Sequence, residues 1–184
     1  MVTIKLTSEL SELEVIRQLQ ELNLTKNITE AEAQSQGFLS AAYSLEFLKL
    51  MHDKHPSVIA KDGEAVVGYA LVSPKSIKGN HPLLDDLFGK IDDLTYNQIP
   101  LKNANYVVVG QLCVAKEYRG QGLVKQLYNY YRECLSDKFD YCITDVASDN
   151  PRSRKSHLSV GFNVIATMTY GGISWDIILW DWKG

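Results

Sequence analysis

A loop containing two glycines, "YRGQGL" at residues 118–123, stands between a strand-like run and a helix-like run. The first amides of a helix have no partner within the helix, and the helix dipole adds partial positive charge at that end. Glycines let a large anion approach these amides, so we expect the loop to hold a phosphate or pyrophosphate, with Arg119 and Lys125 nearby. The loop alone is weak evidence, because it is neither a P-loop nor a dinucleotide fingerprint.

The elements that would position this loop follow from the spacing of apolar residues. Tyr106–Val114 predicts a buried central strand, and the apolar residues from Leu123 onward recur at helical spacing until about Ser136. Residues 141–147 predict another strand. A strand, a helix and a second strand in succession indicate a βαβ unit, so these two strands should run parallel.

The rest of the chain predicts a strand at 2–6, three helices near the N-terminus, two shorter helices further on, and two hairpins. The helices should begin at Ser8, near Thr29 and at Ser44, and two shorter ones should cover 83–92 and 152–159. The hairpins should turn at Asp62-Gly63 and Gly171-Gly172, with strands at 57–61, 64–73, 164–170 and 173–182. We expect one domain over 1–184, a mixed sheet with helices on both faces.

Composition limits the class of protein. The 184 residues are 45% apolar, enough for a core without disulfides or metals, and the net charge of 19 minus 22, or −3, gives no basic field for nucleic acid. Three unpaired cysteines, Cys113, Cys134 and Cys142, suit a reducing cytoplasm and are expected to be structural thiols. No signal peptide or membrane-spanning run is expected.

The residues around the loop, Val114 to Leu123, strongly resemble the coenzyme A loop of the GNAT acetyltransferase family, whose pattern is Arg/Gln-x-x-Gly-x-Gly/Ala. Arg119 and Gly122 match it, whereas Val124 stands where the family prefers Gly or Ala. Downstream, "NPRSRKSHLSVGF" at 150–162 is similar to the family's Asn-x-x-Ala…Tyr…Gly-Phe segment. Asn150 and Gly161-Phe162 fall in register there, and Ser153 takes the small-residue place.

The resemblance implies an α/β, GNAT-like fold, with a mixed, mostly antiparallel sheet whose central parallel strands splay apart. It implies an N-acetyltransferase that passes acetyl from acetyl-CoA directly to an amine, which we expect to be a small molecule, and it implies no metal. A non-catalytic acyl-CoA-binding or sensing domain is the alternative, and a module that has lost the ligand is a further one. The implied coenzyme-binding residues are Arg119, Gly120, Gln121, Gly122, Leu123 and Val124 around the pyrophosphate, the backbone of Leu112 and Val114 along the pantetheine arm, and Asn150.

The candidate catalytic residues lie outside the glycine loop. The register puts His157 where the family often has a tyrosine that protonates the leaving thiolate, so His157 is a candidate general acid or only packs beside the coenzyme. Gln111 stands where a relative might carry a carboxylate, and an amide cannot accept a proton. Asp145 is a weaker candidate that would order a water, or it is a structural carboxylate. Tyr69 and Glu64 are weaker still.

The resemblance places the acceptor pocket among three segments: 36–43, 74–105 and 170–175. The middle segment mixes four aspartates with four lysines, so a solvated surface competes with a site for a cationic amine. The run 173–182 is apolar on both faces, so we expect it to be covered on both sides, by helices of the same chain or by a second subunit of a homodimer.

Overall fold

The computed structural model describes residues 1–36 and 38–183, with only the backbone path for 34–36. The main strands are β1 (Val2–Leu6), β2 (Val58–Asp62), β3 (Ala65–Pro74), β6 (Tyr106–Val114), β7 (Tyr141–Ala147), β8 (Asn163–Tyr170) and β9 (Ile173–Asp181), and two short ones, β4 (Thr95–Tyr96) and β5 (Ile99–Pro100), pair apart from them. The helices are α1 (Leu10–Asn23), α2 (Glu30–Gln36), α3 (Leu45–Lys54), α4 (Pro82–Asp92), α5 (Leu123–Leu135) and α6 (Pro151–Val160). Single turns of 3₁₀-helix connect several of these elements.

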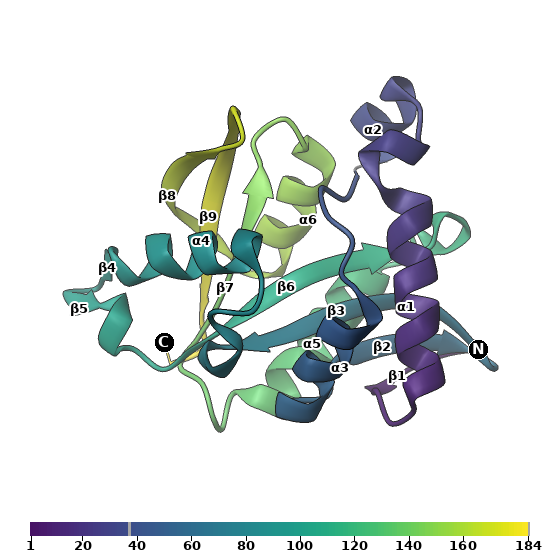
Figure 1. Ribbon diagram of the computed structural model, residues 1–184, viewed down its shortest axis with the longest axis horizontal. Helices are drawn as coiled ribbons and strands as arrows, with labels where there is room; N and C mark the ends of the chain where they lie inside the picture. The colour runs from purple at the N-terminus through teal and green to yellow at the C-terminus, as the bar shows by residue number, and fades with distance from the viewer. Residues whose placement is uncertain (37, 184) are drawn as a thin grey trace.

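The main sheet has seven strands in the order β1-β2-β3-β6-β7-β9-β8 (Figure 1). Its pairs are antiparallel except for β6 and β7, which run parallel on either side of the crossover helix α5. The mixed, mostly antiparallel sheet expected from the sequence is therefore confirmed.

The parallel pair is short. β6 pairs with β7 only over Tyr106–Val108, and beyond this point it remains bonded to β3 on its other side as far as Val114. The register between β3 and β6 also shifts, so that Gly110 and Gln111 stand opposite Leu71 alone. Such a bulge bends the strand that carries the extra residue, so β6 leaves β7 here and the two strands splay.

Gly110 sits at this bulge for a steric reason. A Cβ built on Gly110 would collide with the hydroxyl of Ser73 on β3. Only a residue without a side chain leaves room for the Ser73 hydroxyl at the point where β6 turns away from β7.

Helices cover both faces of the sheet (Figure 1). α1, α3 and α4 bury one face in a cluster that includes Ile177 and Leu179 of β9, while α5 buries the other face against Ile178 and Trp180. From Trp175 onward both faces of the last strand are thus covered within the chain, so this part of the apolar run requires no second subunit. Among the described residues, no helix is long and apolar enough to cross a membrane.

Local capping explains where the helices begin. Ser44 accepts a hydrogen bond of 3.2 Å from the amide of Phe47, and the hydroxyl of Thr29 accepts one of 3.2 Å from Glu32, as the sequence predicts. The first helix differs: it begins at Leu10, and Ser8 lies outside it. The reason is Glu12, whose carboxylate accepts the amides of both Ser8 and Glu9, at 2.8 and 3.2 Å.

Candidate active site

The glycine loop leads from β6 into α5, and its backbone has the conformation that only glycine adopts readily. Gly120 and Gly122 have φ values of +78° and +75°, and Gly122 immediately precedes the helix. No atom lies within 4 Å of a Cβ built at either position. The two glycines therefore allow the backbone to turn, and they leave open space above the free amides at the start of α5.

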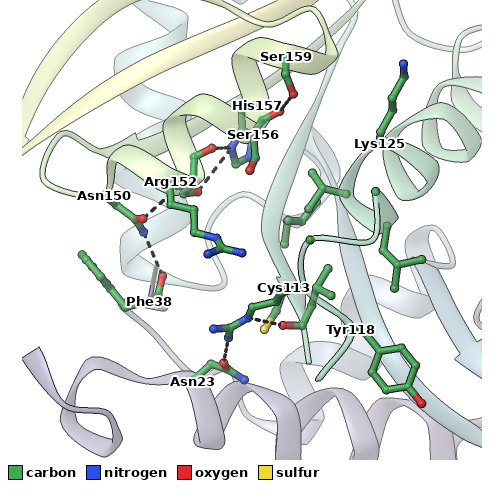
Figure 2. Close-up of a pocket in the computed structure, with 18 of the residues that line it drawn as sticks. Asn23, Phe38, Cys113, Tyr118, Lys125, Asn150, Arg152, Ser156, His157 and Ser159 are labelled. Carbon is green, nitrogen blue, oxygen red and sulfur yellow. Dashed lines mark hydrogen bonds between the residues drawn. The ribbon is translucent and has the colours of Figure 1, made fainter. Parts of the chain in front are cut away.

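Arg119 joins this loop to distant parts of the chain. Its Nε donates a 3.0 Å hydrogen bond to the carbonyl of Val114, and its guanidinium also donates to Asn23 at the end of α1 (Figure 2). The arginine thus ties the end of β6 to the first helix while its charge stays at the loop.

A cavity of about 390 Å³ lies between this loop, the splayed end of β6 and α6 (Figure 2). The side chain of Gln121, by contrast, turns to the backbone of its own loop, where it donates 2.9 Å to the carbonyl of Glu117. The structure brings together at the cavity all of the coenzyme-binding residues predicted from the sequence except Gln121: Leu112, Val114, Arg119, Gly120, Gly122, Leu123, Val124 and Asn150.

The charge of this cavity is opposite in sign to that of the whole chain. The charged side chains that line it, among the described residues, are Arg119, Lys125 and Arg152, and no carboxylate is among them. The chain as a whole carries a net charge of −3. A cationic cavity bordered by free helix amides is a site for a polyanion.

The splay leaves one edge of β6 without a neighbouring strand. The amide of Ala115 donates 2.8 Å to Val67 of β3, so by the alternation of a strand the backbone groups of Leu112 and Val114 face the other way, into the cavity. The carbonyl of Val114 already accepts Arg119. The backbone of Leu112 and the amide of Val114 are therefore the groups that an extended ligand would meet along this edge.

A second, smaller cavity of about 90 Å³ lies on the other side of the splay. It draws on all three segments predicted for an acceptor: Phe38 to Ser40, Leu83 of α4 and Trp175 of β9. Gly37, which belongs to the first of these segments, falls outside the described residues. The two cavities meet at the splay, because they share the lining residues Phe38, Leu39, Leu112, Asn150, Ser153 and His157.

Asp145 of β7 is the charged residue of the smaller cavity. The residue keeps some exposure to the cavity, but its carboxyl is surrounded by protein, and this desolvation, with a smaller effect from the nearby carboxylate of Asp86, raises its pKa to about 6. Within the described part of the chain it forms no salt bridge. Such a carboxylate is ionised at neutral pH and has affinity for a proton.

His157 is buried in α6 and lines both cavities. Its Nδ1 lies 2.7 Å from the carbonyl of Ser153, and because a carbonyl only accepts, Nδ1 carries the hydrogen. Burial lowers the pKa of His157, with the Ser153 hydrogen bond acting in the opposite sense. The neutral imidazole therefore presents a lone pair, not a proton, at Nε2.

Gln111 is fully engaged in hydrogen bonds. Its Oε1 accepts from Gln20 at 2.8 Å and from the hydroxyl of Tyr69 at 2.7 Å, while its Nε2 donates 2.7 Å to the carbonyl of Ala41. Gln20 in turn accepts the amide of Tyr43. This network links the loop after α2 to β6, so the role of Gln111 is to hold the cavity wall in position.

The two weakest base candidates lie in unsuitable places. Burial raises the pKa of Tyr69 well above its usual value, and its hydroxyl is held by Gln111. Glu64 is exposed in the turn between β2 and β3, where it pairs with Lys61 at 3.6 Å, and it lines neither cavity. The three cysteines are free thiols, and burial raises the pKa of each. None is activated as a nucleophile.

Sequence reasoning missed the residues that reach the site from elsewhere in the fold. Asn23 comes from the first helix, more than ninety residues before the glycine loop, and Phe38, expected only at the acceptor pocket, also lines the coenzyme cavity. No local pattern marks such residues, since only the tertiary structure places them at the cavity.

The Acetyltransferase (GNAT) family model matches residues 16–162. Several solved structures share the fold. The ribosomal-protein-S18-alanine N-acetyltransferase from Escherichia coli is 12% identical at a TM-score of 0.64, covering 98% of this chain and 94% of its own. The Salmonella typhimurium protein yncA, solved with its cofactor acetyl-CoA, is 14% identical at a TM-score of 0.64, covering 99% and 94%.

The NatC complex bound to Gag peptide and CoA is 14% identical at a TM-score of 0.66, covering 98% of this chain and 98% of that one. No curated protein matches the sequence. These identities establish the shared fold, whereas the family model covers most of the chain, including the glycine loop and the segment at 150–162. This chain therefore belongs to the GNAT family of acetyltransferases.

Proposed function

We propose that the protein is an N-acetyltransferase that transfers acetyl from acetyl-CoA directly to an amine. The observation that carries the proposal is the pair of joined cavities, of which the larger is lined by cations and the smaller by Asp145. A polyanionic donor and a cationic acceptor would meet at the splay between β6 and β7.

The coenzyme would occupy the larger cavity. Its pyrophosphate would rest on the amides from Arg119 to Val124, and the pantetheine arm would add a partial strand along Leu112 and Val114. Asn150 would border the arm, although its amide already caps α6 at Ser153 and donates 3.4 Å to the carbonyl of Phe38. The side chain of Val124 lines the cavity and would narrow the approach to the amides.

Acyl transfer requires a neutral amine, and the acceptor arrives protonated. Asp145 would take this proton, directly or through a water, and it would pass the proton to solvent. The amine nitrogen would then attack the thioester carbon, a C–N bond would form and the C–S bond would break. The nitrogen loses a second proton and the thiolate gains one, which gives the amide and free coenzyme A.

His157 lies where the thiol of the coenzyme would arrive. The prediction that it is a general acid stays a prediction, and the geometry weighs against it, because a neutral imidazole with hydrogen on Nδ1 has none to donate from Nε2. In our proposal His157 accepts a hydrogen bond from the thiol of the product, and water protonates the thiolate.

The cellular setting belongs to the same proposal. Free cysteines and the absence of a membrane-crossing helix among the described residues support a cytoplasmic protein. A homodimer stays a prediction.

The first test is thermal melting with acetyl-CoA, coenzyme A and dephospho-coenzyme A. A ligand at ~100 times its dissociation constant stabilises the native state by about 2.7 kcal/mol, which raises the melting temperature measurably. No rise at millimolar acetyl-CoA would refute the proposal. Release of free thiol on addition of amines would then separate an enzyme from a non-catalytic acyl-CoA-binding domain, which would bind and release nothing.

A further inference from the structure

We infer that the acceptor is a cationic alkyl or arylalkyl amine that carries no carboxylate beside its amino group, which excludes the α-amino group of amino acids. The inference rests on the proposed function and concerns the smaller cavity, where the amine would enter.

The walls of this cavity combine apolar and uncharged polar side chains with one charge. Phe38, Leu83, Val146 and Trp175 line it together with Asp145, and no lysine or arginine is among the described residues of the lining. A carboxylate on the carbon that bears the amine would be buried beside Asp145 with no cation to balance it. Like charges brought together in a desolvated pocket reject a ligand strongly.

A second carboxylate, that of Asp86, strengthens the selection against acceptors that carry a carboxylate. Asp86 on α4 lies close enough to Asp145 that its charge raises the pKa of that carboxyl. α4 also supplies Leu83 to the cavity wall, so the helix brings both an apolar contact and a negative charge to the amine end. An ammonium group would offset both carboxylates, whereas an amino acid would bring a third.

The shape favours an acceptor that inserts only its amine end. The cavity measures about 90 Å³, less than a quarter of the coenzyme cavity at about 390 Å³. The ring of Trp175 forms one wall and is held in place by its Nε1, which donates 3.4 Å to the carbonyl of Tyr170. A fixed indole beside a carboxylate suits the methylene groups and the charge of an aminoalkyl chain.

The decisive experiment uses matched pairs of acceptors that differ only in the carboxylate: 3-methylbutylamine with leucine, and phenethylamine with phenylalanine. Binding to the protein saturated with coenzyme A is measured by calorimetry, and turnover with acetyl-CoA by thiol release. We expect at least one of the two amines to bind, with a kcat/KM at least about tenfold higher than that of the corresponding amino acid. Equal or better use of leucine or phenylalanine would overturn the inference.

A short peptide with a free N-terminus serves as a third type of acceptor. Preferential acetylation of this peptide would overturn the small-amine class. Failure of both decarboxylated amines to bind, in protein that still binds coenzyme A, would overturn it as well. If acetyl-CoA itself does not bind, the proposed function fails, so the two failures are distinguishable.

Asp86→Asn tests the charge on α4. We expect it to raise KM for the cationic amines several-fold at unchanged kcat, and to shift the acidic limb of the pH profile downward, because the carboxylate that raises the pKa of Asp145 is gone. Asp93→Asn, an exposed change of equal charge just after the same helix, is the control and should alter neither. An unchanged KM and pH profile in Asp86→Asn would show that the charge of Asp86 does not act on the acceptor.

Discussion

The hydroxyl of Thr144 on β7 donates a 2.8 Å hydrogen bond to the carbonyl of Val109 on β6. This contact lies one residue past the last paired position of the parallel ladder, Val108 with Ile143. A side chain here takes the place of a backbone partner, so the strands separate without leaving the carbonyl unsatisfied.

Thr144→Val keeps the shape of this side chain and deletes its donor. Because Thr144 is buried, the carbonyl of Val109 would be left without its partner, and we expect a loss of about 1–3 kcal/mol in the free energy of unfolding. Thr144→Ser should recover most of the hydrogen-bond energy. Denaturant titration of the three proteins checks this, and equal stability of the valine variant would show that water replaces the hydroxyl.

Gly122→Ile tests the coenzyme loop. A β-branched residue at φ +75° is strained and would place its side chain over the free amides, so acetyl-CoA affinity should fall at least about 100-fold while the fold persists. Gly63→Ile is the matched control, since Gly63 has φ +58° and equally open space but lies in the β2–β3 turn. Calorimetry should show normal acetyl-CoA binding in the control alone. Similar losses in both variants would point to general destabilisation.

Asp145→Asn should separate activity from stability. The pKa of this carboxyl rises from the ordinary value of 3.8, which it has in the unfolded chain, to about 6 in the folded protein. The buried charge therefore lowers the free energy of unfolding above pH 6, and this loss disappears below about pH 4. The variant should therefore be more stable at pH 7, by an amount on the order of 2 kcal/mol, and this gain should vanish as the pH falls from 6 to 4. Its turnover should fall about 100-fold or more if Asp145 is the base.

Denaturation between pH 4 and 8, together with initial rates, measures both effects. The wild-type rate should decline below pH 6, as the carboxyl gains its proton. Asp149→Asn, an exposed change two residues beyond the end of β7, should leave stability and rate unaltered. An active Asp145→Asn variant would leave Asp145 a structural residue.

His157→Phe tests the general acid. Since the folded protein lowers the pKa of His157 below 6.5, the native state binds this proton less tightly than the unfolded chain, and stability is lost as the pH falls through 6.5. The phenylalanine variant should lack this loss. Because the imidazole is neutral at pH 8, kcat there should fall by less than about tenfold, whereas a fall of ~100-fold or more at unchanged acetyl-CoA affinity would restore the acid role.

The sequence predicts most of the elements that hold the site, because their patterns are local. The strand Tyr106–Val114 and the helix from Leu123 agree with the structure, and so do the glycine turns. The short β4–β5 pair was missed, since its turn uses Asn97 and Gln98, both at positive φ, in place of the usual glycine.

The contacts of the candidate catalytic residues could not be predicted from the sequence for a different reason. The pKa of Asp145 depends on what covers it and on Asp86, which belongs to a separate helix. The tautomer of His157 follows from a carbonyl one turn away, and the hydrogen bonds of Gln111 include one to Gln20, 91 positions earlier. Burial and partner choice at these positions are properties of the packed chain.

Under the proposed function, the smaller cavity also bears on how the product leaves. Acetylation would turn the ammonium into an amide that is uncharged at neutral pH, so the reaction itself would remove the charge that holds the acceptor near Asp145. The amide would remain as an uncharged ligand beside a carboxylate that regains its affinity for water and for the next cation. Product departure would thus be driven by the chemical step, and accumulated amide would be a poor inhibitor of the next turnover.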